Sequence, residues 1–323
     1  MRNKYWLDGI MGVVVGDALG LPVQFMYPKE IKNRKRGPVT GMEGYGTFNM
    51  PEGTWSDDSS MTLATLDSIN IKKRLDPGSI MINFLRWYAK GEYTPFGQSF
   101  DHGSTCIAAI TNFSRNPDYK TCGKKGEYAN GNGALMRIMP VCLYAYDKNR
   151  EDPTYDDNRA IADIHDIAAL THNHLRSNMA CGLYYFCVKE ILNNKDKQSL
   201  QECLQRGIDA GLAYYRKDIA NLTELAHFGR LFNLDELKYI SDKNIRFSGY
   251  VVDSLEAAVW SLINTTSFSG GLLKAVNYGD DSDTVAAIAG GLAGLYYGID
   301  EIPSDWLAVI QKREWIEQMV MEH

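Results

Sequence analysis

The stretch Tyr278-Gly-Asp-Asp-Ser-Asp-Thr-Val-Ala-Ala-Ile-Ala-Gly-Gly-Leu-Ala-Gly-Leu-Tyr-Tyr-Gly298 decides the fold of this chain. It carries three carboxylates, Asp280, Asp281 and Asp283, directly before an apolar run built mostly of Ala and Gly. Side chains this small bury little area on a surface, so the run predicts a central helix on which neighbouring elements pack very closely. The acids then lie at the edge of the core, where isolated carboxylates are costly unless they are paired or bound to a cation.

Helix capping is a second interpretation of the same residues. Ser282 or Asp283 can cap the helix while the other acids remain in solvent. Taken alone, the stretch does not decide between capping and a bound cation.

A second oxygen-rich cluster, Ser56, Asp57 and Asp58, also stands at the start of a predicted helix, and it shifts the balance towards a cation. Adjacent acids in a turn before a helix can diverge and reach two cations. Carboxylate and hydroxyl oxygens without nearby His or Cys favour Mg²⁺ or Mn²⁺ over zinc. Two such clusters therefore predict a site for two ions.

The rest of the chain is expected to be all-α, because no segment shows sustained two-residue alternation of apolar side chains. No linker or shift in composition divides the sequence, so we expect one domain over residues 1–323. Residues 37–56 and 147–158 are predicted to be loops. Helices are predicted over residues 6–19, 56–75, 79–90, 106–113, 134–146, 160–170, 175–192, 200–215, 250–263, 268–278 and 304–321, with short helices within 222–239.

Composition and charge exclude several classes of protein. The net charge of the 323 residues is −6 and the acids are spread along the chain, which argues against a nucleic-acid surface. The six cysteines form no Cys-x-x-Cys pair, as expected of reduced core residues. The N-terminus lacks a convincing signal-peptide cleavage site, and the longest apolar run, near the C-terminus, is shorter than the ~18 residues of a membrane span. We expect a cytoplasmic monomer without a membrane partner.

Five motifs carry a resemblance to a known family. They occur in the order seen in the ADP-ribosylglycohydrolase family, and the resemblance covers nearly the whole chain. The motifs are Gly16-Asp-Ala-Leu-Gly20, Gly53-Thr-Trp-Ser-Asp-Asp58, Asn130-Gly-Asn-Gly-Ala-Leu-Met-Arg137, Leu170-Thr-His172 and Gly279-Asp-Asp-Ser-Asp-Thr-Val-Ala-Ala-Ile-Ala-Gly290.

The resemblance implies a compact, single-domain orthogonal bundle of helices with a binuclear Mg²⁺ or Mn²⁺ centre. It also implies hydrolysis of the bond between ADP-ribose and an acceptor, either a protein side chain or a small molecule. Asp57, Asp58 and Asp281 are the catalytic residues by this resemblance. The metal ligands by the same resemblance are Ser56, Asp57, Asp58, Asp281, Asp283 and Thr284.

Substrate-binding residues are assigned by resemblance as well. Backbone N–H groups near Asn132 and Gly133 resemble the family's loop around the diphosphate and distal ribose. His172 resembles a histidine near the ribose, and Asp101 and Gly103 resemble another loop at the cleft. Aromatic loop residues are candidates to stack on adenine, although ordinary packing is the alternative for each: Tyr45, Phe48, Trp55, Tyr93, Phe96 and Tyr128.

Gln24 departs from the family pattern, since many members have a Glu there that is proposed to act in acid/base catalysis. An amide does not accept a proton from water at neutral pH. Three outcomes follow: a metal-bound water suffices with Asp57 or Asp281 as proton acceptor, the substrate differs from that of the members with Glu, or the protein binds ADP-ribose without cleaving it. The alternative function is thus a non-catalytic ADP-ribose reader or a structural, crystallin-like member of the same fold.

Overall fold

The computed structural model describes residues 2–322, and within them the chain forms sixteen α-helices and no β-strand. The all-α prediction is therefore confirmed. The predicted domain limits, residues 1 and 323, lie outside the described residues. The helices are α1 (Arg2–Gly20), α2 (Pro28–Asn33), α3 (Asp57–Lys72), α4 (Pro77–Lys90), α5 (Ser104–Arg115), α6 (Met139–Glu151), α7 (Asp157–Ala168), α8 (Leu175–Asn194), α9 (Leu200–Tyr215), α10 (Leu222–Leu225), α11 (Leu234–Lys238), α12 (Val251–Ile263), α13 (Phe268–Val276), α14 (Ser282–Tyr297), α15 (Ser304–Val309) and α16 (Arg313–Met321).

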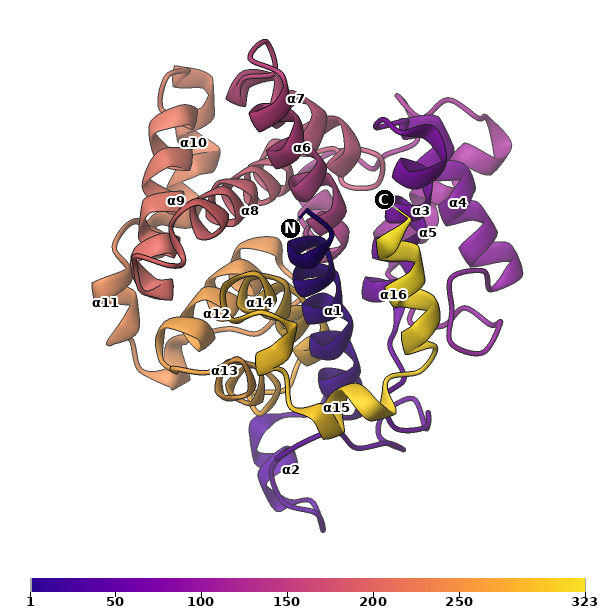
Figure 1. Ribbon diagram of the computed structural model, residues 1–323, viewed down its shortest axis with the longest axis vertical. Coiled ribbons are helices and arrows are strands. Elements are labelled where there is room, and N and C mark those ends of the chain that lie inside the picture. Colours follow the sequence, from indigo (N-terminus) through magenta and orange to yellow (C-terminus); the bar gives the residue numbers. More distant parts are fainter. Residues whose placement is uncertain (1, 323) are drawn as a thin grey trace.

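Helices α1 and α14 pack against each other at the centre of the fold, although they come from opposite ends of the chain (Figure 1). Glycines allow their backbones to touch. A Cβ atom on Gly12 would lie 2.1 Å from the carbonyl oxygen of Gly290, and one on Gly16 would lie 2.0 Å from that of Ala286. Both distances are far below van der Waals contact, so the prediction of a closely packed central helix is confirmed.

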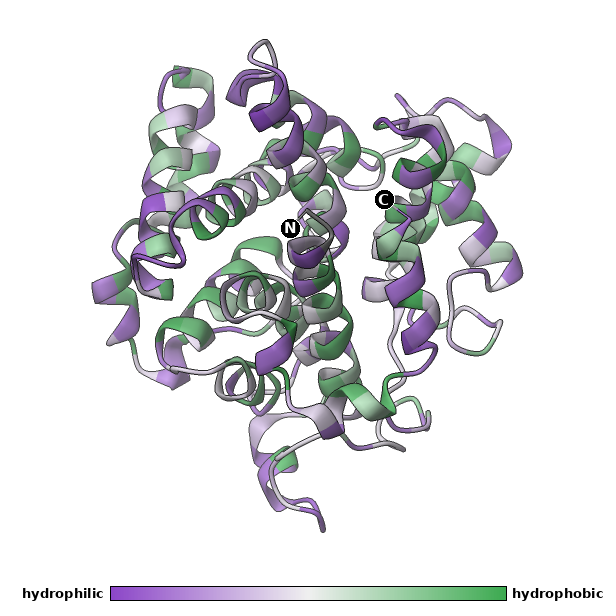
Figure 2. Ribbon diagram, in the orientation of Figure 1, coloured by the Kyte–Doolittle hydropathy of each residue, from purple (hydrophilic) through white to green (hydrophobic). Residues whose placement is uncertain are grey.

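The other helices surround this pair in two groups. Helices α8, α12 and α13 pack on α14, whereas α3 and α16 pack on α1 (Figure 1). Apolar residues gather on the inner helices, and hydrophilic residues mark outer helices such as α7 (Figure 2). One hydrophobic cluster connects all of these elements. The start of α14 and the start of α3 thereby meet near the end of α1.

The single predicted helix over 304–321 is wrong, because α15 and α16 are separate. Lys312 between them has a left-handed backbone with φ +54°. The connecting segment also bonds to a distant loop: the N–H of Gln311 donates to Gly53 O (3.0 Å), and Trp55 Nε1 donates to Gln311 O (2.9 Å). These long-range bonds replace helical ones, which explains the break.

The predicted loop over 147–158 begins too early, because α6 continues to Glu151. Asp147 is buried rather than on the surface, and it accepts hydrogen bonds from Trp6 Nε1 (2.9 Å) and from the hydroxyl of Tyr5. Its carboxylate therefore fastens the N-terminal helix to α6.

Residues Lys4–Val23 are long and apolar enough to cross a membrane by composition alone. In the structure, however, 94% of an 18-residue apolar stretch within this segment is buried inside the protein. This segment is the core helix α1 and the short turn that follows it.

Candidate active site

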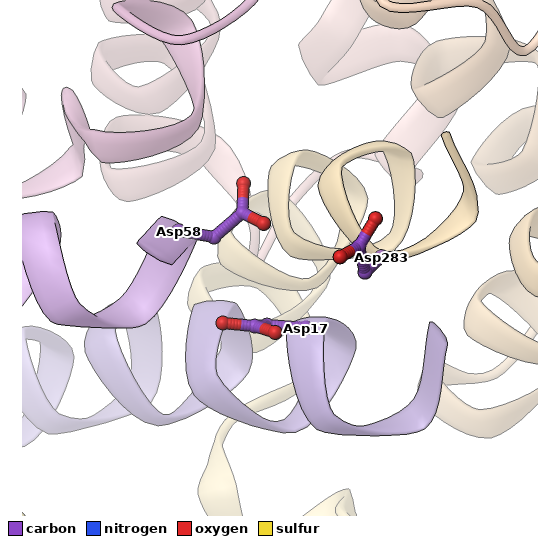
Figure 3. Close-up of side chains that lie close together, drawn as sticks. All are labelled: Asp17, Asp58 and Asp283. Atoms are coloured by element: carbon purple, nitrogen blue, oxygen red, sulfur yellow. The ribbon is translucent and has the colours of Figure 1, made fainter. Parts of the chain in front are cut away.

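Three helices bring three buried carboxylates together. Asp17 near the end of α1, Asp58 in the first turn of α3 and Asp283 in the first turn of α14 each place a carboxylate oxygen within 4.8 Å of the others. Figure 3 shows the three side chains extending into one space from the three helices. The sequence predicted Asp58 and Asp283 for this site but not Asp17.

Asp17 also builds the first turn of α3. Its carboxylate accepts hydrogen bonds from the N–H of Ser56 (2.9 Å) and from the N–H and hydroxyl of Ser59 (3.0 and 2.6 Å). Ser56 is the N-cap of α3. Asp17 therefore fixes where Asp57 and Asp58 begin the helix. The signal for this role was an acid inside the apolar run of α1, within the motif Gly16-Asp-Ala-Leu-Gly20.

A cleft of about 230 Å³ opens above these acids. All six residues predicted to bind substrate line it: Gln24, Asp101, Gly103, Asn132, Gly133 and His172. Of the predicted metal ligands, Asp57, Asp281 and Thr284 line the cleft as well. Residues from four of the five sequence motifs thus line one cleft, and Asp17 of the fifth motif lies in the buried cluster beside it.

The remaining predicted ligands, Ser56, Asp58 and Asp283, are buried beside the cleft. A hydroxyl group connects Asp58 to the cleft, because Thr284 Oγ1 donates to Asp58 Oδ2 (3.3 Å). Ser56 Oγ donates to the same oxygen (3.1 Å). The neighbours Asp57 and Asp58 diverge: one carboxylate lies at the cleft and the other in the buried cluster. This divergence agrees with the expectation for adjacent acids at a helix start.

Burial and mutual repulsion disfavour ionisation of these acids. Burial raises the pKa of Asp17 and of Asp101 to about 6. The pKa values of Asp57, Asp58 and Asp283 are raised well above the ordinary range, first by burial and then by neighbouring carboxylates. Among the described residues, no Lys or Arg forms an ion pair with these acids. A bound cation would favour the ionised forms.

Several oxygen atoms at the site are buried without a hydrogen-bond partner. They are Asp58 Oδ1, Asp101 Oδ2, Asp283 Oδ2 and Gln24 Oε1. Leaving such atoms unsatisfied costs about 1–3 kcal/mol each, and more for charged groups. Carboxylate and amide oxygens are ligands that hard divalent cations prefer. The donor set and its unsatisfied oxygens therefore fit a metal ion.

Asn132 holds one of the acids in place. Its side-chain amide donates to Asp281 Oδ2 (2.6 Å) and to Ser254 Oγ (3.0 Å). Its backbone N–H donates to Gly249 O (3.0 Å), so this N–H is not free to approach an anionic ligand. That donor closes the loop against the segment before α12, and the assignment of this loop to the diphosphate and distal ribose stays a prediction.

His172 is buried and borders the cleft beside Gly131 and Gly133. Burial, and then the charge of Arg137, lowers its pKa to about 3. The imidazole is therefore neutral at pH 7. By contrast, His174 caps α8, where its ring accepts the N–H of Arg176 (3.2 Å).

Three phenylalanines form a row at the rim of the cleft. Phe25 lines the cleft and is 59% exposed, which leaves a ring face open to a ligand. Its ring centre lies 6.3 Å from that of Phe48, which lies 5.5 Å from that of Phe100. Of the residues predicted to stack on adenine, Phe48 belongs to this row, whereas Trp55 is fully buried and bonded to Gln311. Phe25 was not among the residues predicted to stack on adenine.

Gln24 lies between two of the acids. Hydrogen bonds from its side chain lower the pKa values of Asp101 and Asp281, against the larger effect of burial. Its amide therefore stabilises the ionised carboxylates. This supporting role accounts for its place in the cleft, and it does not supply a proton acceptor.

Asp280 is exposed and takes no part in the buried cluster. Its backbone is left-handed, with φ +53°, and bonds to the loop after α1: its N–H donates to Met26 O (2.9 Å), and its carbonyl accepts the N–H of Phe25 (2.6 Å). Asp280 therefore shapes the turn that presents Asp281 and Phe25.

Comparisons with known proteins agree with this geometry. The ADP-ribosylglycohydrolase family matches residues 5–322. The chain is 29% identical to the ADP-ribosylarginine hydrolase Tri1 of Pseudomonas putida, over 97% of this chain and 76% of that protein. It is 30% identical to the ADP-ribosyl-[dinitrogen reductase] glycohydrolase of Rhodospirillum rubrum, over 95% of this chain and 90% of that protein.

A solved structure is similar over nearly its whole length. It is described as an ADP-ribosylglycohydrolase-related protein complex, and it superimposes with a TM-score of 0.75 at 27% identity, covering 99% of this chain and 97% of the other. Sequence, fold and site thus agree along the chain. The protein belongs to the ADP-ribosylglycohydrolase family and is a hydrolase of that family.

Proposed function

We propose that the protein cleaves the glycosidic bond between ADP-ribose and an acceptor, using two Mg²⁺ or Mn²⁺ ions held by the acids of the cleft. The observation that carries the proposal is a group of six carboxylates without a cationic partner among the described residues: Asp57, Asp101 and Asp281 line the cleft, and Asp17, Asp58 and Asp283 form the buried cluster beside it. A group of buried, ionised carboxylates destabilises the folded protein unless a bound cation compensates their charge.

Each group of residues has a distinct task in this proposal. Asp58, Asp283 and Thr284 would hold metal at the floor, together with Ser56. Asp57 and Asp281 line the cleft and would hold metal on its open side, where one of them accepts the proton of the attacking water. Divalent cations supply Lewis acidity that favours attack by water on an anomeric carbon.

Binding of ADP-ribose is assigned to the remainder of the cleft. Asn132 keeps Asp281 oriented, and His172 faces the cleft beside Gly133. The exposed ring of Phe25 offers a surface on which adenine can stack. Relatives named for ADP-ribosylarginine and for ADP-ribosylated dinitrogen reductase support a protein-linked acceptor.

The test is release of ADP-ribose from an ADP-ribosylated arginine peptide, with and without metal. We expect release with Mg²⁺ or Mn²⁺, loss of release in EDTA, and recovery when the metal is restored. Full activity in EDTA would rule out the metal mechanism.

A non-catalytic reader on the same fold is the second candidate, and Gln24 in place of a proton-accepting acid is the observation that favours it. Calorimetry with ADP-ribose beside the turnover assay separates the two. Binding with turnover supports the hydrolase, whereas binding without release from any acceptor supports the reader.

Gln24→Glu tests whether a carboxylate at this position raises the rate of cleavage. The new carboxylate would sit between Asp101 and Asp281, where it can accept a proton from water. General bases contribute about 10²–10⁴-fold to rate, so we expect a gain of up to about 100-fold on one acceptor in a panel of ADP-ribose conjugates. Gln24→Met is the control, since it removes the amide without adding a base. Equal rates for Gln24→Glu and wild type on every acceptor would contradict the prediction.

The cytoplasm is the proposed location, and a monomer is the proposed state. The six cysteines are free and buried, as in proteins of a reducing compartment. Size-exclusion chromatography with light scattering tests the oligomeric state, for which we expect the mass of one chain.

A further inference from the structure

Arg137 is a fully buried arginine without a carboxylate partner among the described residues. Its Nη2 donates to Thr171 Oγ1 (2.8 Å) and to the carbonyl oxygen of Ile167 (3.2 Å), while Nε and Nη1 have no partner. The guanidinium carbon lies 4.8 Å from the centre of the Phe84 ring. Burying a charge with so few bonds is costly, so the arrangement calls for a specific role.

The hydrogen bond between Arg137 and Thr171 has only one possible direction. A guanidinium carries donors and no acceptor, so Thr171 Oγ1 must accept. The hydroxyl then has a single hydrogen left to donate. Thr171 Oγ1 also lies 2.9 Å from Nδ1 of His172, and its hydroxyl interacts with the buried thiol of Cys106.

His172 Nδ1 is the better acceptor for that hydrogen. Sulfur is a weak acceptor, whereas the unprotonated nitrogen of a neutral imidazole is a good one. The thiol of Cys106 has an acceptor of its own, since it is oriented towards Gly133 O at 3.8 Å. The hydroxyl of Thr171 therefore donates to Nδ1, and the proton of the neutral ring is on Nε2.

The other edge of the ring faces the cleft. A Cβ atom on Gly131 would lie 3.2 Å from His172 Nε2, and one on Gly133 would lie 2.8 Å from its Cε1. Only glycines leave room for this edge. Among the described residues, Nε2 has no hydrogen-bond partner, so its N–H is available to a ligand in the cleft.

We propose that Arg137 and Thr171 are positioning residues that fix His172 as the Nε2–H tautomer, which donates a hydrogen bond to an oxygen of ADP-ribose. The identity of the ligand rests on the proposed function, whereas the tautomer rests on the protein alone. A ring fixed in this way cannot accept a proton from the substrate through Nε2. The acids of the cleft must therefore carry out proton transfer. The N–H of His172 instead favours ligands that place an acceptor oxygen near Nε2.

The tautomer is tested by ¹⁵N NMR of the ligand-free, histidine-labelled protein. A His172→Gln sample assigns the His172 signals among the six histidines. We expect Nδ1 to resonate as an unprotonated nitrogen and Nε2 as a protonated one at pH 7. The opposite pattern in wild type would overturn the proposal, whether or not the protein cleaves any conjugate.

Two substitutions of Thr171, one that keeps the hydroxyl and one that replaces it with a methyl group, test its role in fixing the tautomer. Thr171→Ser keeps the hydroxyl, so both the signals and the affinity for ADP-ribose should be retained. Thr171→Val removes it and should let the two tautomers exchange. The Kd for ADP-ribose should then rise in inverse proportion to the fraction of rings that keep the Nε2–H form, which is about 2-fold for equal populations. Melting curves confirm that both variants are folded.

Calorimetry with ADP-ribose measures the Kd of wild type and of each variant. An unchanged Kd in folded Thr171→Val, with the tautomer lost, would contradict the donor role of His172. Binding of ADP-ribose with the expected tautomer but without turnover would support the proposal and count against the hydrolase assignment.

Discussion

Asp283→Asn is expected to reduce release of ADP-ribose more than about 100-fold, beyond the 10- to 100-fold typical when only a group supporting a metal ligand is lost. Asp283 is fully buried, and its Oδ2 atom has no partner among the described residues. An amide there is a poorer cation ligand and carries no charge. The measurement is the release rate at saturating Mn²⁺.

The same substitution should raise the stability of the metal-free protein. Burial and four neighbouring acids raise the pKa of Asp283, so its ionised form destabilises the fold at neutral pH. Asn removes that charge and can donate to Asp58. We therefore expect a higher melting temperature in EDTA than for wild type, and a smaller rise on adding Mn²⁺.

The opposite signs of these two effects distinguish a metal ligand from a structural residue, whose loss would lower both stability and activity. Asp280→Asn is the matched control, because it is the same chemical change in an exposed residue of the same turn. It should leave the release rate unchanged. Retained activity in Asp283→Asn would contradict its role as a ligand.

Gly16→Ala is expected to destabilise the fold by about 3 kcal/mol or more, at or beyond the upper end of the usual cost of overpacking. The new methyl group would lie 2.0 Å from the carbonyl oxygen of Ala286, so α1 and α14 must separate. Helix propensity alone predicts the opposite sign, a gain of about 0.5–1 kcal/mol for Ala over Gly. Urea unfolding with EDTA present measures the change.

Activity should fall with stability in this variant, because Gly16 precedes Asp17 and the two helices carry Asp17 and Asp283. The control is Gly78→Ala in α4, where the added methyl group meets nothing closer than 3.5 Å. That variant should be at least as stable as wild type, because only the gain in helix propensity remains. A neutral result for Gly16→Ala would show that the helices can shift without cost.

Elements with local signals were predictable from the sequence. Helix α9 has the predicted bounds, Leu200–Tyr215, because Ser199 and Glu202 form a capping box at its start. The close packing of α14 was predictable for a similar reason. Side chains as small as Ala and Gly bury enough area only when neighbouring helices approach closely. Both predictions depend on neighbours in sequence.

Features set by distant contacts were not predictable in this way. The break between α15 and α16 depends on hydrogen bonds to Gly53 and Trp55, which are more than 250 residues away in the chain. The sequence at the break contains no Gly or Pro that would predict the end of a helix. Asp17 stood within a recognised motif, but its position beside Asp283 follows from how closely α1 and α14 approach. The supporting role of Asn132 likewise required the position of Asp281.

The central pairing also affects how this protein is made. Helix α1 leaves the ribosome before its main partner α14, and a separation of 262 positions in the chain divides Gly20 from Ser282. At 5–20 residues per second, that separation corresponds to roughly 13–50 s of synthesis. Throughout this interval the nascent chain displays a helix as apolar as a membrane span without its partner. Its yield in cells should therefore depend on chaperones that cover that helix until α14 has been synthesised.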